Sequence, residues 1–164
     1  QPFVDDGRIN IIYNQHAKEW TKQEGYAHMK YCFSVFNPEK IDVVIAANDN
    51  LASGVIKAIE EIKPEKNILI AGQDADLEAC RRIVSGKQTM TVYKPIRQIA
   101  EIAAEAAVAL AKGEVLKNAT FAVNNNHKLV ASILFPAKVV DKNTMEATVI
   151  KDNYLKREQI YENH

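Results

Sequence analysis

Cysteine, tryptophan and net charge are all scarce in this sequence: its 164 residues include two Cys and one Trp, and the formal net charge is zero. Cys32 and Cys80 lie far apart and form no Cys-x-x-Cys pair, which favours two buried thiols on helices over a disulfide and disfavours a metal site. No apolar run reaches the length of a membrane span. Because the chain also has no basic tract, its electrostatics argue against nucleic acid as a partner.

The common motifs of catalysis and metal binding are missing as well. The sequence contains no Gly-x-Ser-x-Gly, no glycine loop ending in Gly-Lys-Ser or Gly-Lys-Thr, and no His-x-x-x-His. The turn Asp5-Asp6-Gly7 is too short for a calcium loop. We therefore expect no catalytic residue, no metal and no cofactor.

Short apolar segments typical of strands alternate along the chain with segments of helical periodicity. This alternation predicts an α/β fold with a doubly wound parallel sheet. The polar tail at 141–164 is predicted to be surface loop with a helical piece at its end. Strands are predicted at 8–13, 42–47, 67–71, 88–93, 120–123 and 131–135, and helices at 21–36, 51–62, 77–84 and 96–112. The first of these helices is predicted to begin with a capping box of Thr21 and Glu24 and to stop at Asn37-Pro38.

Polar side chains follow four of the predicted strands, at the point where each strand ends. Gln15 and His16 follow the first strand, Asn48 the second, Asp74 the third and Lys94 the fourth. The carboxyl ends of parallel strands meet at one edge of a sheet, which is where ligands bind in open α/β folds. The sequence thus predicts that an amide, a carboxylate and an ammonium group converge there.

Such a set suits a small, neutral ligand with several hydroxyl groups. A carboxylate accepts hydrogen bonds from two adjacent hydroxyls, an ammonium donates them, and an amide does both. The apolar face of a sugar would lie against an aromatic ring, for which His16 and Trp20 are the candidates. Either ring could equally be an ordinary loop or partly buried side chain.

The other polar residues have structural alternatives too. Asp49 and Asp76 suit the N-caps of the helices that follow them, and Asp74 taken alone could also be a cap. Asn48 alone could be a turn residue and Lys94 alone a solvated charge. Only their joint placement at one edge favours a binding site.

Three stretches resemble a known family. They are Ala46-Ala47-Asn48-Asp49, Ile70-Ala71-Gly72-Gln73-Asp74-Ala75-Asp76 and Gln88-Thr89-Met90-Thr91-Val92-Tyr93-Lys94-Pro95. They resemble the D-xylose-binding members of the type I periplasmic sugar-binding proteins, and the stretch Val149-Ile150-Lys151-Asp152 is similar to the end of those proteins.

The resemblance implies a two-lobed receptor that closes on a monosaccharide, D-xylose above all, and that catalyses no reaction of the sugar. It also implies a location in the periplasm or on a cell-surface lipoprotein, and a membrane permease or sensor kinase as the partner. Asn48, Asp74 and Lys94 would bond sugar hydroxyls. Family members have Gln-Trp where this chain has Gln15-His16, and Trp20 matches a second family Trp. The resemblance therefore does not decide whether His16 or Trp20 stacks on the sugar.

The resemblance further implies a division of the chain. Residues 1–94 would form the carboxy-terminal sugar-binding lobe, residues 95–128 would cross to the amino-terminal lobe, and residues 129–164 would hold a return strand and the tail. Family members are much longer, so we expect a fragment without its amino-terminal lobe, or else a separately encoded half. Two other hypotheses remain: the effector-binding core of a lactose-repressor-type regulator, and an α/β enzyme that uses Asp74 and Lys94.

Overall fold

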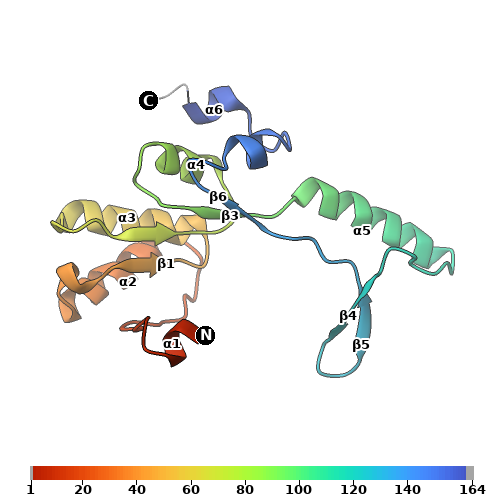
Figure 1. Cartoon of the computed structure of the whole chain (residues 1–164), viewed down its shortest axis with the longest axis horizontal. Helices are drawn as coiled ribbons and strands as arrows, with labels where there is room; N and C mark the ends of the chain where they lie inside the picture. The colour runs from red at the N-terminus through yellow and green to blue at the C-terminus, as the bar shows by residue number, and fades with distance from the viewer. Residues whose placement is uncertain (1, 162–164) are drawn as a thin grey trace.

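The computed structural model describes residues 2–161, so the last three residues of the predicted tail lie outside the described part (Figure 1). It confirms the α/β class, with a parallel sheet and helices between the strands. The helical elements are α1 Pro2–Asp5, α2 Lys22–Val35, η1 Pro38–Lys40, α3 Asp49–Ile62, α4 Leu77–Val84, α5 Ile96–Ala111, η2 Glu146–Ile150 and α6 Arg157–Tyr161. The strands are β1 Val43–Ile45, β2 Leu69–Ala71, β3 Thr91–Tyr93, β4 Phe121–Asn124, β5 Leu129–Ser132 and β6 Lys138–Val140.

The central sheet runs in the order β1, β2, β3 and β6. Strands β1 and β2 are parallel, with Val44 opposite Ile70, and a parallel bridge from Ala71 to Met90 continues the sheet to β3. Strand β6 pairs with β3 in the antiparallel direction. The carboxyl ends of β1, β2 and β3 therefore share one edge, as the sequence predicts.

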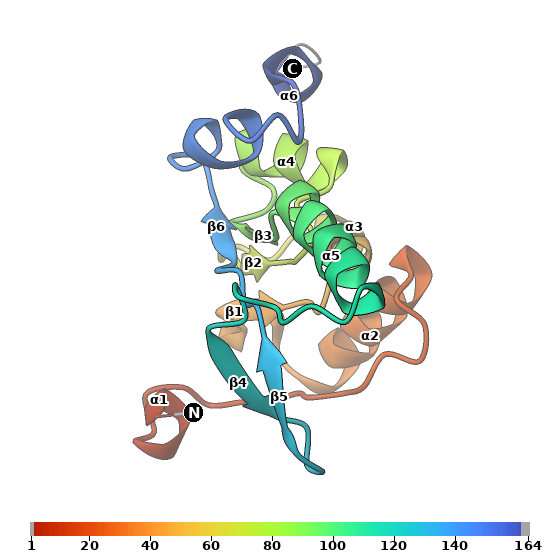
Figure 2. The ribbon, with the colours of Figure 1, turned by 90° about the vertical axis from the view of Figure 1, so that its right-hand side faces the viewer.

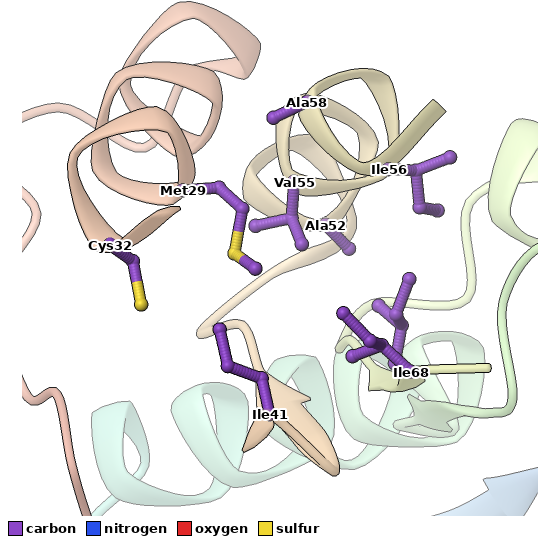
Figure 3. Packing of buried hydrophobic residues seen from close by; sticks show 9 residues of the cluster. Met29, Cys32, Ile41, Ala52, Val55, Ile56, Ala58 and Ile68 are labelled. Atoms are coloured by element: carbon purple, nitrogen blue, oxygen red, sulfur yellow. The ribbon is translucent and has the colours of Figure 1, made fainter. Parts of the chain in front are cut away.

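Helices α2 and α3 pack together against one face of β1 and β2. Thr21 caps α2, because its hydroxyl accepts the N–H of Glu24 at 3.3 Å, and the helix ends before the predicted stop at Asn37-Pro38. Figure 3 shows the apolar side chains that meet between the helices and the sheet. The buried members of this first core are Met29, Cys32, Ile41, Ala52, Val55, Ile56, Ala58, Ile68 and Ile70.

A second core lies beside β3 and corrects the prediction for the tail. Met145, Val149 and Ile160 are fully buried against α4 and the end of the sheet, so part of the described tail belongs to the core and is not a surface loop. The predicted helical piece is present as α6. The tail escaped prediction because its apolar residues sit on a π-helical turn and a short helix, whose spacing does not follow an α-helical stripe.

The first predicted strand is wrong. Residues 8–13 form no strand: residues 8 and 9 lie in a bend, residues 10–13 have no regular secondary structure, and a short helix, α1, precedes them. Ile9 and Ile11 are 50% and 57% exposed, because no strand among residues 2–161 lies alongside to pair with this segment. Alternating apolar residues satisfy the pattern of a strand, but a strand also needs a hydrogen-bonded neighbour.

Helix α5 and the hairpin of β4 and β5 extend away from both cores, as Figures 1 and 2 show. We call residues 96–137 the arm. No residue of the arm is buried. The predicted strand at 120–123 corresponds to β4, whereas β5 begins two residues before the predicted strand at 131–135 and ends at Ser132. In the hairpin Ala122 lies opposite Ala131.

Both cysteines are buried free thiols on helices, as predicted. Burial, together with the nearby carboxylates of Asp49 and Asp76, raises the pKa of Cys80 to about 12. The Cys80 thiol therefore stays protonated at neutral pH and behaves as a small apolar side chain.

Candidate functional site

Asp74 and Lys94 form an ion pair at the carboxyl edge of the sheet. Lys94 Nζ lies 2.6 Å from Asp74 Oδ1, and the Lys94 and Asp74 side chains are 40% and 46% exposed. The pair follows β2 and β3 directly. Because opposite charges are matched and both groups remain accessible, this part of the edge can bond a neutral polar ligand.

Asn48 lies at the end of β1 and is the N-cap of α3. Its Oδ1 accepts the N–H of Leu51 at 2.8 Å, and its Nδ2 donates to the backbone carbonyl of Trp20 at 3.4 Å. The cap is thus one residue earlier than predicted, since Asp49 is the first residue of the helix. The prediction that Asp76 caps α4 is confirmed by its Oδ1, which accepts the N–H of Ala79 at 2.6 Å.

The turn that carries Asp74 has an unusual backbone. Asp74 and Ala75 have φ values of 105° and 55°, in the region that side chains normally avoid, at a cost of about 1–3 kcal/mol per residue. The N–H of Asp74 donates to the carbonyl of Val92 at 2.9 Å. The N–H of Ala75 donates to Thr91 Oγ1 at 3.2 Å, and the N–H of Asp76 to Asp49 Oδ2 at 3.1 Å. These bonds hold the turn in its strained shape.

Asp49 is buried beneath this turn, where its carboxylate accepts several hydrogen bonds, and it is not a helix cap. Its carboxylate, in a residue only 1% exposed, accepts from Gln88 Nε2 and Thr91 Oγ1, both at 2.9 Å. Burial raises the pKa of Asp49, while the hydrogen bonds from Gln88, Asp76 and Thr91 oppose that rise. Gly72 makes room for the carboxylate, because a Cβ there would lie 2.1 Å from Asp49 Oδ1.

The two candidate aromatic residues precede α2. Trp20 is 50% exposed, and the bond from Asn48 to its carbonyl places its backbone beside the edge. His16 is exposed, and no hydrogen bond or ring contact of residues 2–161 joins it to the other predicted site residues. The structure thus connects Asp74 with Lys94 and Asn48 with Trp20, and leaves His16 apart.

Glu24 holds the segment that carries these rings. Its carboxylate accepts the N–H of Lys18 at 2.6 Å and that of Glu19 at 2.5 Å. Burial raises the pKa of Glu24, but these two bonds and the neighbouring His28 outweigh it and leave the pKa below its usual value. The sequence predicts a capping box from Glu24 to Thr21, whereas the carboxylate caps the loop just before it.

Two cavities lie away from this edge. The larger, about 490 Å³, is lined by residues of α2 and α3 with Arg82 and Lys87, and the second, about 390 Å³, by residues from α3 to the start of β2 with Gly86 and Lys87. None of the predicted ligand residues lines either one. We give more weight to the chemistry of the edge, because it carries matched and accessible charged groups.

Two negative findings apply to residues 2–161. No three His, Cys, Asp or Glu side chains there come together as metal ligands. No helix in that range is long and apolar enough to span a membrane.

The buried network of Asp49, Gln88 and Thr91 was not found from the sequence. Its only signal is indirect: Thr91 and Tyr93 alternate with Val92 along a strand, which places the hydroxyl of Thr91 on a buried face where it needs a partner. The left-handed turn at Asp74 carries no signal, because the neighbouring glycine, Gly72, is not the residue with positive φ.

Comparison with known proteins agrees with this architecture. A sequence model of the family described as "Periplasmic binding protein domain" matches residues 3–115. The chain is 39% identical to a D-xylose-binding periplasmic protein of Haemophilus influenzae, over 98% of this chain and 48% of the relative. It is 40% identical to the D-xylose-binding periplasmic protein of Escherichia coli over the same shares. The chain therefore spans about half the length of these curated relatives.

Solved structures give the same result. A solute-binding protein of an ABC transporter from Clostridium phytofermentans, with bound β-D-glucose, matches with a TM-score of 0.81 and 25% identity over 97% of this chain and 52% of its own. A carbohydrate transporter solute-binding protein from Chloroflexus aurantiacus, in complex with D-glucose, matches with a TM-score of 0.76 and 26% identity over 84% and 41%.

Proposed function

Because the chain belongs to the periplasmic binding protein domain family, we propose that it forms one sugar-binding lobe of a receptor for a monosaccharide, most specifically D-xylose. The observation that carries this proposal is the half-exposed ion pair of Asp74 and Lys94 at the carboxyl edge of a parallel sheet. The similarity to two D-xylose-binding periplasmic proteins supports the choice of sugar.

The chemistry of the edge suits hydroxyl groups. The pair with Lys94 uses one ammonium donor and engages Asp74 at Oδ1, so the carboxylate can accept from sugar hydroxyls and the ammonium can donate to others. Hydrogen bonds to charged groups contribute about 1.5–3 kcal/mol each, which is enough for a few of them to orient a sugar. Asn48 would add its amide, and the exposed ring of Trp20 or His16 would cover an apolar sugar face.

In the proposed receptor, residues 1–94 belong to the carboxy-terminal lobe, residues 95–128 to the connection with a second lobe, and residues 129–164 to the return. The exposed apolar side chains of α5 and the hairpin support this division, because such faces mark surfaces that another unit covers. A sugar held by both lobes would favour the closed form through hinge closure.

The proposed setting is extracytoplasmic, either in the periplasm or on a cell-surface lipoprotein. The closed receptor would be read by a membrane permease or by a membrane sensor kinase. We propose no catalytic step, since binding and closure account for the groups at the edge.

The proposal is tested by isothermal titration calorimetry of D-xylose with the complete protein that carries this sequence. Asp74→Ala removes the central acceptor, and we expect it to abolish measurable binding while the fold is retained. The matched control is Asp42→Ala. Asp42 is also an aspartate in an ion pair, with Lys66, but it directly precedes β1 and so lies at the opposite end of the sheet. Asp42→Ala should leave the affinity unchanged.

Unchanged affinity in Asp74→Ala would refute the assignment of the site. Trp20→Ala and His16→Ala, measured in the same way, decide which ring lies against the sugar. Loss of affinity in only one of them identifies that ring.

A further inference from the structure

We infer that Asp49 and Thr91 act as positioning residues that set the place of Asp74 in the binding site, an inference that rests on the function proposed above. Neither residue has to touch the ligand in this role. The structural basis is the chain of hydrogen bonds from the buried Asp49 carboxylate through the Thr91 hydroxyl to the backbone beside Asp74.

The Thr91 hydroxyl links two partners. It donates to Asp49 Oδ2 at 2.9 Å, which directs its lone pairs toward the N–H of Ala75 at 3.2 Å. Thr91 is fully buried, as is Ala75, so no solvent molecule competes at the surface for either bond. The orientation of the hydroxyl is therefore set by Asp49.

Asp49 also holds the turn directly. The same Oδ2 accepts the N–H of Asp76 at 3.1 Å, so the two backbone groups that follow Asp74 are both tied to the Asp49–Thr91 pair. Asp49 Oδ1 is fixed in turn by Gln88 Nε2 at 2.9 Å, and Gln88 Oε1 accepts from Arg82 Nε at 3.0 Å. The carboxylate therefore cannot rotate away from the turn without breaking several bonds.

The backbone of the turn needs such support. Asp74 and Ala75 both have positive φ, a backbone conformation that residues other than glycine rarely adopt unless the surrounding structure imposes it. If the turn relaxed, the Asp74 carboxylate would leave its place opposite Lys94 Nζ. Gly72 is part of the same arrangement, because any side chain there would collide with Asp49 Oδ1.

Substitution of Thr91 tests the inference. Thr91→Val keeps the shape of the side chain and removes the hydroxyl, whereas Thr91→Ser keeps the hydroxyl. We expect Thr91→Val to weaken D-xylose binding about tenfold, as the loss of one buried hydrogen-bond partner implies. Thr91→Ser should bind D-xylose with nearly the wild-type affinity. The matched control is Thr89→Val, because the Thr89 hydroxyl also accepts a backbone N–H, that of Ile70 at 2.9 Å, away from the turn.

A double-mutant cycle separates positioning from general damage. Because Thr91 is inferred to act through Asp74, Thr91→Val should weaken binding much less in an Asp74→Asn background than in the wild type. Circular dichroism at the titration temperature shows whether each variant is folded. If Thr91→Val does not fold, Asp49→Asn takes its place, since it keeps the volume and replaces one acceptor oxygen by a donor.

The outcomes are distinct. Wild-type affinity in folded Thr91→Val, an equal loss in Thr89→Val, or an undiminished effect in the Asp74→Asn background overturns the inference while the proposed function stands. Failure of the wild-type protein to bind any monosaccharide overturns the proposed function itself, and the inference with it.

Discussion

The packed part of the molecule, which holds both cores, and the arm at residues 96–137 are built from equally regular elements but differ in burial. Helix α3 buries seven of its residues between α2 and the sheet, whereas α5, which is longer, buries none. Strand β3 has two buried residues of three, and β4 has none. Regular hydrogen bonding therefore does not distinguish the two regions, and side-chain packing does.

The difference shows what each region needs in order to be stable. The packed part supplies its own apolar partners, while the arm presents large apolar side chains to solvent, among them Ile96, Val108, Leu110, Phe121 and Leu129. Most helical stability in proteins comes from packing an apolar face, so α5 lacks the usual source of stability in this arrangement. This contrast is the reason for the proposal that a second lobe covers the arm.

A large effect is expected in the packed part, at the contact between α2 and α3. A Cβ on Gly54 would lie 1.9 Å from the carbonyl oxygen of Lys22 and 2.5 Å from the backbone nitrogen of Tyr26. Backbone atoms cannot move out of the way by changing rotamer, so Gly54→Ala must push the two helices apart. We expect it to lower the free energy of unfolding by about 3 kcal/mol or more, measured by urea denaturation.

Ser53→Ala is the control, since it also places an alanine on α3, one residue earlier, but adds no atom to the contact between the helices. It should change the free energy of unfolding by no more than about 0.5 kcal/mol. Equal stability of the Gly54→Ala and Ser53→Ala variants would contradict the close approach of the two helices.

The smallest expected effect is in the arm. Leu110 is 61% exposed and Ile56 is 5% exposed, so the same truncation should have unequal costs. In the 164-residue chain we expect Leu110→Ala to cost about 0.5 kcal/mol or less, and Ile56→Ala about 2–5 kcal/mol. Urea denaturation of the two variants checks the difference.

The same pair of variants sharpens the comparison in the complete protein. If a second lobe covers α5, the cost of Leu110→Ala should rise there, while the cost of Ile56→Ala should not. A large cost of Leu110→Ala in the 164-residue chain itself would mean that α5 is already covered.

Local patterns were enough to predict most elements of the fold. The apolar stripe of α3, the cap at Thr21 and the stop at Asn37-Pro38 each depend on residues close in sequence. The unpaired segment 8–13 and the buried Met145 could not be predicted in this way, because a strand partner and a core neighbour are properties of the whole fold. Local rules thus gave the elements, and tertiary context decided which of them pack.

The candidate site divides in the same manner. Asn48, Asp74 and Lys94 were placed at one edge because strand ends can be read from the sequence. Asp49 was misassigned as a cap, since a carboxylate after a strand looks the same whether it faces the first turn of a helix or a buried threonine from a distant strand. Distinguishing the two requires the contact with Thr91, which is 42 residues away.

The most direct test of the proposed sugar site is a crystal structure of the complete protein with D-xylose. We expect sugar hydroxyls within about 2.6–3.2 Å of the Asp74 carboxylate, the Lys94 ammonium and the Asn48 amide, and α5 packed against a second lobe. A sugar bound elsewhere, with the Asp74–Lys94 pair still facing solvent, would contradict it.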